Sequence, residues 1–275
     1  MSTEIDEIAV GFIGAGAMGS ALAKAVSRVI PADHIYLADS SPEKTRQRAA
    51  KIGARAAESN ADAARRCGVI FIGVKPYLVA DVLTGIAPEL KGKTLVSMAA
   101  GVSLTAIKDC LAETRTAPPA ATVRIMPNTP VSVGEGIVAL AADDRQNAAA
   151  ELVKTLLSRA GRIEQVPESL IDCAGAVSGS GPAYGFIFIE ALADAAVLLG
   201  MPRNQAYIYA AQTLKGAAAL ALESGAHPAA LKDAVCSPGG TTIEAVSVLE
   251  ERGFRAAIIH AVRAAHNKSA AVGKK

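Results

Sequence analysis

The sequence predicts an α/β protein, with a parallel-rich sheet in its first part and an all-α domain at its C-terminus. In the first half of the 275 residues, short β-branched runs alternate with helical patterns, as in strand–helix–strand units. The strand patterns stop after residues 161–167, and long helical patterns follow. Apolar residues make up 51% of the chain but aromatic residues only 4%, so we expect a core of small aliphatic side chains and closely packed helices.

Four strands are predicted in the first hundred residues. The first covers residues 8–13 and is followed by apolar residues at the three-and-four spacing of a helix face. The second covers residues 34–38, after which Ser41-Pro42-Glu43 begins a helix with proline at an early position. The third and fourth cover residues 68–74 and 94–98. Fully apolar strands of this kind indicate a sheet covered on both faces.

The second half of the chain is predicted to be mainly helical. Helices are expected over residues 182–199 and 203–223, and the first of them is apolar nearly all round. It is the longest candidate for a membrane span, but Glu190 and Asp194 lie in its middle. We therefore expect no membrane, and a helix buried in a domain or in a subunit interface.

Composition and charge exclude several classes of protein. The net charge is +2, and no basic run is longer than the terminal Lys274-Lys275, so nucleic acid is not an expected partner. The N-terminal Met1–Glu7 is polar and acidic, unlike a signal peptide, and the four histidines show no metal spacing. We expect a cytoplasmic protein without a metal, because the cysteines are isolated ones at Cys67, Cys110, Cys173 and Cys236.

The segment Gly14-Ala15-Gly16-Ala17-Met18-Gly19 has GxGxxG spacing and lies between a predicted strand and a predicted helix. In a dinucleotide-binding Rossmann domain the first glycine permits a tight turn, the second lets the backbone approach a pyrophosphate, and the third lets helix and strand pack closely. The phosphates would bind at the N-terminus of the helix. The alternative is a glycine-rich turn without a ligand.

The choice between NADH and NADPH stays open from the residues after the second strand. Asp39 follows Gly19 by twenty residues, where an acid binds the ribose hydroxyls and disfavours a 2′-phosphate. Ser40 and Ser41 come next, and their hydroxyls can instead bind that phosphate.

Three further segments follow strands, at the edge of an open α/β sheet where ligands bind. Val74-Lys75-Pro76 follows the third strand, with a solvated lysine as the alternative interpretation, and Ala99-Ala100-Gly101 is small enough for backbone to meet a nicotinamide. Met126-Pro127-Asn128-Thr129-Pro130 is a rigid turn that either contacts the cofactor or only reverses the chain.

Two segments rich in glycine and hydroxyl groups interrupt the helical half, at residues 178–182 and 237–242. Each precedes a helix and offers backbone N–H groups at a positive helix end, which suits a small carboxylate, although helix capping alone also explains them. No Ser-His-Asp set and no paired catalytic carboxylates are evident. Reduction of an imine by hydride transfer fits this inventory.

With these segments identified, the chain resembles the pyrroline-5-carboxylate reductases over nearly its full length. The resemblance lies in Gly-Phe-Ile-Gly-Ala-Gly-Ala-Met at 11–18, Val-Lys-Pro at 74–76, Ala-Ala-Gly-Val at 99–102, Met-Pro-Asn-Thr-Pro at 126–130, Ser-Gly-Ser-Gly-Pro-Ala-Tyr at 178–184 and Leu-Lys-Asp-Ala-Val-Cys-Ser-Pro-Gly-Gly-Thr-Thr at 231–242. It implies a Rossmann domain over residues 1–165 and a helical dimerisation and substrate-binding domain over residues 166–275. It also implies a homodimer through the C-terminal helices, often assembled into a ring of dimers.

The implied activity is NAD(P)H-dependent hydride transfer to the imine carbon of 1-pyrroline-5-carboxylate, a CH–NH oxidoreductase reaction that gives L-proline in the last step of proline biosynthesis. The resemblance implies that Ser237, Gly240 and Thr241 hold the substrate carboxylate, that Thr242 binds the ring nitrogen as the catalytic candidate, and that Glu168 contacts the ligand. Together with the motifs above, the expected cofactor residues are Ile13, Gly14, Ala15, Gly16, Ala17, Met18, Asp39, Ser40, Ser41, Asn60, Val74, Lys75, Pro76, Ala99, Ala100 and Asn128.

The chain departs from the family pattern at two places. Relatives carry asparagine where this chain has Ala234, so one ligand contact is expected to be absent or replaced by water. Many bacterial relatives carry Asn-Arg near Asp39-Ser40, and the absence of that arginine weakens the case for strict NADPH use. The expected cofactor is NADPH, with NADH possible. One rival is a β-hydroxyacid dehydrogenase, whose helical Lys and Asn lie four residues apart; here Lys215 is followed at that distance by Ala219. The other rival is a sensor or scaffold that binds NAD(P)H without catalysis.

Overall fold

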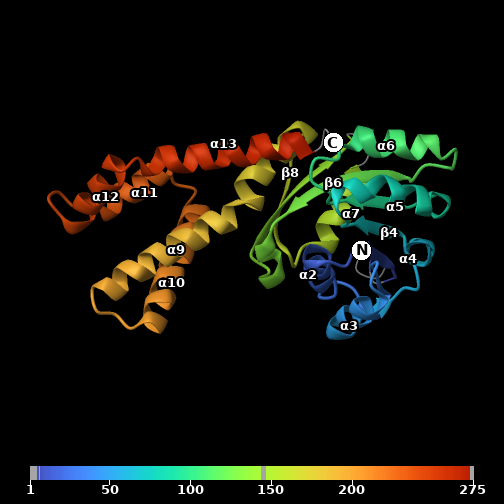
Figure 1. The fold of residues 1–275 in the computed structure, drawn as a ribbon, viewed down its shortest axis with the longest axis horizontal. Coiled ribbons are helices and arrows are strands. Elements are labelled where there is room, and N and C mark those ends of the chain that lie inside the picture. Colours follow the sequence, from blue (N-terminus) through green and yellow to red (C-terminus); the bar gives the residue numbers. More distant parts are fainter. Residues whose placement is uncertain (1–4, 6, 144–146, 273–275) are drawn as a thin grey trace. The chain divides into compact units, whose positions relative to one another are not determined.

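The computed structural model describes residue 5 and residues 7–143 and 147–272 of the chain (Figure 1). By its internal contacts the chain forms two compact units, one of which is Gly181–Ala264 and the other the remainder. The first unit therefore extends past β8 (Gly161–Gln165), because Ile171 of α8 (Ile171–Ala174) is buried against Ala139 and Ala141 of β7. The predicted domains, residues 1–165 for cofactor binding and residues 166–275 for dimerisation and substrate binding, are defined by function, and this division stays a prediction.

One sheet dominates the first unit. Among the described residues it has eight strands in the order β3-β2-β1-β4-β5-β6-β7-β8. All neighbouring pairs are parallel except β6 and β7, which are antiparallel. The fold class predicted from the sequence is confirmed, and the four predicted strands are present but slightly shorter. The strands are β1 (Val10–Ile13), β2 (Ile35–Ala38), β3 (Arg55–Ala56), β4 (Val69–Ile72), β5 (Thr94–Ser97), β6 (Ala121–Pro127), β7 (Gly136–Ala142) and β8.

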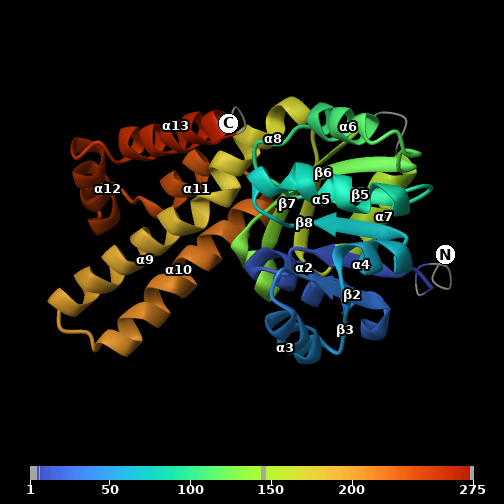
Figure 2. The ribbon, with the colours of Figure 1, turned by 45° about the vertical axis from the view of Figure 1, so that its right-hand side comes forward.

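Helices cover both faces of this sheet, as the apolar strands predicted (Figure 2). Side chains alternate along a strand, so Phe12 of β1 points into one core and Ile13 into the other. In the first core Phe12 stacks on Phe71, with 4.6 Å between the ring centroids. That core is closed by α2 (Ala17–Val26), α3 (Pro42–Ile52) and α7 (Asn147–Leu156), and the second by α4 (Asn60–Arg66), α5 (Val79–Ile86) and α6 (Leu104–Glu113).

The cysteines are all free thiols. Cys67 is buried between α4 and β1, where its sulfur would lie 3.2 Å from a Cβ added at Gly11. Burial raises the pKa of the Cys67 thiol to about 12, so this side chain stays neutral and serves as a packing residue.

The second unit is entirely helical among its described residues. It contains α9 (Gly181–Leu198), α10 (Arg203–Ser224), α11 (Pro228–Val235), α12 (Thr241–Glu251) and the first part of α13 (Phe254–Val272). Gly200, with φ of 96°, permits the tight turn between α9 and α10. The predicted helices over 182–199 and 203–223 are confirmed to within one residue at each end.

The second unit buries very little apolar surface within one chain. Its buried hydrophobic residues, among those described, are Ala193, Ala206 and Ala210, where α9 and α10 meet. By contrast Phe186 and Ile187 of α9 are 64% and 66% exposed. Of the two alternatives expected for α9, burial within its own domain is not found among the described residues, and burial in a subunit interface remains, since large exposed apolar patches are rare on monomers.

One helical stretch of the described residues, Glu168–Leu198, is long and apolar enough by length and composition to cross a membrane, with 31 residues. It carries Glu190 and Asp194, and Asp194 pairs with Arg203 of α10. Such charges and ion pairs are costly in a lipid environment.

Candidate functional site

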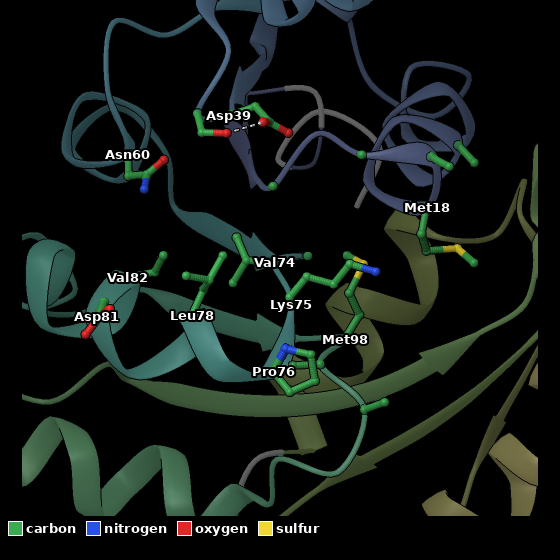
Figure 3. Close-up of a pocket in the computed structure, with 18 of the residues that line it drawn as sticks. Met18, Asp39, Asn60, Val74, Lys75, Pro76, Leu78, Asp81, Val82 and Met98 are labelled. Carbon is green, nitrogen blue, oxygen red and sulfur yellow. Dashed lines mark hydrogen bonds between the residues drawn. The ribbon is translucent and has the colours of Figure 1, made fainter. Parts of the chain in front are cut away.

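A cavity of about 1070 Å³ lies at the carboxyl ends of β1, β2, β4 and β5 (Figure 3). The chain passes from β1 outward in one direction to β2 and in the other to β4, which makes this edge the topological switch point where open α/β sheets bind ligands. Twelve of the predicted cofactor residues line this cavity, namely Gly14, Gly16, Ala17, Met18, Asp39, Ser40, Asn60, Val74, Lys75, Pro76, Ala99 and Ala100.

The glycine-rich loop has a conformation that suits a pyrophosphate. Gly14 has φ of 89°, and a Cβ added there would lie 2.6 Å from the carbonyl carbon of Gly73. A Cβ at Gly19 would lie 2.4 Å from the carbonyl oxygen of Gly14, whereas a Cβ at Gly16 would meet nothing within 4 Å and would point into open space. The first and third glycines are thus required by packing, and the second is required only if a ligand approaches.

The N-terminus of α2 faces this cavity without a cap. Gly16 is the N-cap residue, no side chain caps the first turn, and no acidic residue lies there. The backbone N–H groups and the positive end of the helix dipole are therefore available to an anion. The residues present fit the diphosphate of a dinucleotide cofactor.

Replacing Gly16 with valine should weaken binding of NADPH by at least about ten-fold while changing the free energy of unfolding by less than about 1 kcal/mol. The added side chain would occupy the space of a pyrophosphate without striking the protein itself. Fluorescence titration and thermal unfolding measure the two quantities. Gly68→Val is the matched control, because a Cβ there also meets nothing within 4 Å and Gly68 does not line the cavity. Unchanged NADPH affinity in Gly16→Val would contradict the assigned phosphate site.

The predicted ribose end of the cavity is formed by Asp39 and Ser40. The Ser40 hydroxyl donates to Asp39 Oδ1 over 3.2 Å, as the dashed line in Figure 3 shows. Ser41 does not line the cavity; its carbonyl accepts from the Thr45 hydroxyl over 2.8 Å inside α3. Sequence reasoning missed Arg48 of α3, whose guanidinium lies 3.7 Å from Asp39 Oδ2.

The opposite wall comes from α4 and from the segment after β4. Asn60 begins α4, and the Ser59 hydroxyl caps this helix by accepting from Asp62 N–H over 3.0 Å. The Arg66 guanidinium donates a hydrogen bond to Asp62 over 2.8 Å, which holds the pKa of that carboxyl below its usual value. Thr129, from the Met126–Pro130 turn, also lines the cavity, and the lining residues outside every predicted binding segment are Ala21, Ser59, Gly73, Leu78, Asp81, Val82, Met98 and Ser132.

Lys75 follows β4 and precedes a short 3₁₀ turn, Pro76–Leu78. Its side chain is exposed and extends toward Met98, which follows β5 (Figure 3). Two neighbouring strands thus place Lys75 and the Ala99-Ala100 backbone at one end of the cavity, where the sequence predicted the nicotinamide.

Three predicted cofactor residues lie beneath the cavity instead of on its surface. Ile13 and Ala15 are buried in the two cores, so only their backbone can contribute to the loop. The Asn128 amide donates to the Ser178 carbonyl over 3.1 Å and its oxygen accepts from Ile137 N–H over 3.0 Å. These bonds give Asn128 a structural role in the turn, and its contact with cofactor stays a prediction.

Glu168, a predicted substrate contact, lies in a charged cluster of the first unit. Its carboxylate accepts from Leu104 N–H over 2.7 Å and from Arg124 over 3.3 Å. Arg124, on β6, also donates to Asp172 over 2.8 Å, and its side chain is only 4% exposed. The cluster joins α6, β6 and α8, while the Glu168 side chain is still 30% exposed and open to a ligand.

The Ser237–Thr242 segment belongs to the second unit and ends at the uncapped N-terminus of α12. Gly240 is the N-cap residue, and no side chain caps the first turn. A Cβ at Gly240 would lie 2.3 Å from the Ser237 hydroxyl and 3.1 Å from the Ser237 carbonyl oxygen, so a side chain there would displace the Ser237 hydroxyl. The simple alternative of side-chain capping is not what the structure has, and the free N–H groups beside Ser237 and Thr241 suit a carboxylate.

Comparison with known proteins agrees with this geometry. Residues 168–272 match the family model for pyrroline-5-carboxylate reductase dimerisation, and residues 9–101 match the model for NADP oxidoreductase, coenzyme F420-dependent. The pyrroline-5-carboxylate reductase of Escherichia coli strain K12 is 44% identical over 275 residues, which cover 96% of this chain and 98% of that protein. This chain belongs to the pyrroline-5-carboxylate reductase family.

Other members of the pyrroline-5-carboxylate reductase family show the same breadth of likeness. The enzyme of Methanosarcina acetivorans is 43% identical, over 97% of this chain and 98% of its own. The crystal structure of Plasmodium falciparum pyrroline carboxylate reductase with NADP bound superposes with a TM-score of 0.86 at 32% identity, over 98% of this chain and 99% of that one. The residues that match the dimerisation model include α9 and α10, which carry exposed apolar side chains.

Proposed function

We propose that this protein reduces 1-pyrroline-5-carboxylate to L-proline with NADPH, the last step of proline biosynthesis, and that NADH serves as a second reductant. The reaction is that of an oxidoreductase acting on CH–NH groups. The observation that carries the proposal is the pairing, in one chain of this family, of a dinucleotide cavity at an uncapped helix end with an intact Ser237–Thr242 segment at another. A sensor that only binds NAD(P)H would need the dinucleotide cavity but not the Ser237–Thr242 segment, so the presence of both favours the enzyme.

The cofactor, when bound, supplies a hydride to the imine carbon, and the chain binds and orients the reactants. The first turn of α2 would hold the diphosphate, Asn60 the ribose side, and Lys75 with the Ala99 backbone the nicotinamide side. Leu78, Val82 and Met98 give the cavity apolar walls that exclude water. Most of the rate then comes from positioning the two reactants.

The substrate carboxylate would be held by Ser237, Gly240 and Thr241 at the positive end of α12, and Glu168 would contribute a further contact. Thr242, in the first turn of α12 and half-buried, would hydrogen-bond the ring nitrogen. A threonine hydroxyl is too weakly acidic to be the sole proton source for that nitrogen. Thr242 is therefore assigned to orientation of an imine that is bound already protonated or receives its proton elsewhere.

Oxidation of NADPH and of NADH, each with and without 1-pyrroline-5-carboxylate, tests the function. Substrate-dependent oxidation that yields proline is the expected result. If the protein binds NADPH but oxidises it with no more than the background rate, the catalytic proposal fails and the sensor takes its place.

We also assign residues 1–165 to cofactor binding and residues 166–275 to dimerisation and substrate binding, in a cytoplasmic protein. The dimers assemble further into a ring. The support is the amount of apolar side chain that the second unit leaves exposed, which includes Ile208 and Tyr209 of α10 besides the face of α9. A molar mass from light scattering that equals one dimer would refute the ring.

Replacing Ile187 with aspartate should convert the dimer into monomers and lower the midpoint of thermal unfolding. The side chain is 66% exposed in the single chain, so its charge is tolerated there but would be buried without a partner in a subunit interface. Sedimentation velocity measures the change. Lys44→Asp, an equally drastic change at an exposed position of α3, should leave the dimer intact. A dimeric Ile187→Asp protein would exclude this face from the interface.

A further inference from the structure

The acid at the end of β2 has a cationic neighbour that no motif predicts. Arg48, on α3, donates to the carbonyl oxygen of Ala15 in the phosphate loop and lies 3.7 Å from Asp39 Oδ2. Ala15 lies 33 residues before Arg48 in the sequence, and Asp39 lies before the start of α3, the helix that carries Arg48. The guanidinium therefore stands between the loop that suits the diphosphate and the carboxylate that faces the ribose.

This position changes the charge that a cofactor meets. Asp39 alone would repel a 2′-phosphate, which carries about −1.5 to −2 at neutral pH. Arg48 offsets that charge, and among the described residues no partner engages its other two nitrogens. A guanidinium has five N–H donors in a planar fork that matches phosphate geometry. The Arg48 side chain is 34% exposed; Arg48 is not one of the residues that line the cavity, but its partner Asp39 is.

We propose that Arg48 is the specificity-determining residue for NADPH in this protein: it binds the 2′-phosphate, while Asp39 accepts the ribose hydroxyls when that phosphate is missing. The proposal rests on the function proposed above and explains how a chain with an acid after β2 accepts NADPH. The cation, Arg48, lies on α3 and not in the loop directly after β2.

Two cofactor fragments without a nicotinamide separate binding from catalysis. The full-length protein is titrated in a calorimeter with 2′-phospho-ADP-ribose and with ADP-ribose. Arg48→Ala should weaken binding of the phosphorylated fragment by about ten-fold or more and change binding of ADP-ribose by less than about two-fold. Asp39→Asn should do the opposite, with tighter binding of the phosphorylated fragment and weaker binding of ADP-ribose.

Arg46 provides the matched control. It is an exposed arginine of the same helix, two residues earlier, and among the described residues no hydrogen bond or ion pair joins it to Asp39 or to the phosphate loop. Arg46→Ala removes the same charge and should leave the preference for the phosphorylated fragment unchanged. An equal loss in Arg46→Ala and Arg48→Ala would show only a general effect of charge, and would overturn the proposal.

A purely structural role for Arg48 gives a different result. If Arg48 only ties α3 to the loop, Arg48→Ala weakens both fragments equally, and this outcome refutes the proposal. Arg48→Gln keeps a donor for the Ala15 carbonyl but has no charge, so it carries the test if the alanine variant does not fold; it should lose the phosphorylated fragment selectively. Failure of the wild-type protein to bind either fragment would refute the proposed cofactor itself, and is thereby distinguished from an error about Arg48.

Discussion

Replacing Arg124 with methionine should lower the free energy of unfolding by about 3 kcal/mol, the lower end of the range for breaking a buried ion pair. The Arg124 side chain is 4% exposed and holds Glu168 and Asp172, which would lose their partner together. Both carboxylates are about a third exposed, so water compensates part of the loss and the upper end of the range is not expected. Chemical denaturation measures the change.

The matched control for this cluster is Arg162→Met. Arg162 pairs with Glu164 on β8, but both side chains are exposed, so the loss should be within about 0.5 kcal/mol. Neutralising both carboxylates, by Glu168→Gln with Asp172→Asn, should destabilise the Arg124→Met protein less than it destabilises the wild type. In the Arg124→Met protein the two carboxylates have already lost their cation, so their removal breaks no ion pair. A loss of less than about 1 kcal/mol in Arg124→Met would show that the cluster is not a structural anchor.

Replacing Thr242 with alanine should lower kcat by about 10- to 150-fold, which corresponds to one hydrogen bond to a charged group, about 1.5–3 kcal/mol. The hydroxyl is assigned to the ring nitrogen, where it orients the imine carbon for hydride transfer, so its loss should lower the rate of the chemical step. The dissociation constant for NADPH should not change, because Thr242 lies in the second unit and the cofactor cavity is lined by the first.

Thr242→Ser keeps the hydroxyl and should restore most of the rate. Ser247→Ala, on the exposed side of the same helix, removes a hydroxyl away from the substrate segment and should leave kcat unchanged. A Thr242→Ala enzyme with full turnover would remove Thr242 from the proposed mechanism, and full turnover in the serine variant alone would confirm that the hydroxyl is what acts.

The sequence by itself determined the fold class and most of the cofactor cavity. Strand and helix patterns are local, and so is the GxGxxG spacing, since the turn, the helix start and the close packing of Gly19 against Gly14 all lie within six residues. Parallel strands then bring their carboxyl ends to one edge, which explains why Asp39, Lys75 and Ala99 meet there as predicted.

The tertiary structure alone decided which side chains are occupied by other parts of the chain. Asn128 is engaged by Ser178 and Glu168 by Arg124, across 50 and 44 residues of sequence, and no local pattern encodes such pairs. Arg48 is of the same kind, because its partners are set by how α3 packs beside the phosphate loop. The helix α9 shows the converse. Its pattern predicted burial, but the described residues of its own chain leave Phe186 and Ile187 exposed, because a pattern states that a face is apolar without stating what covers it.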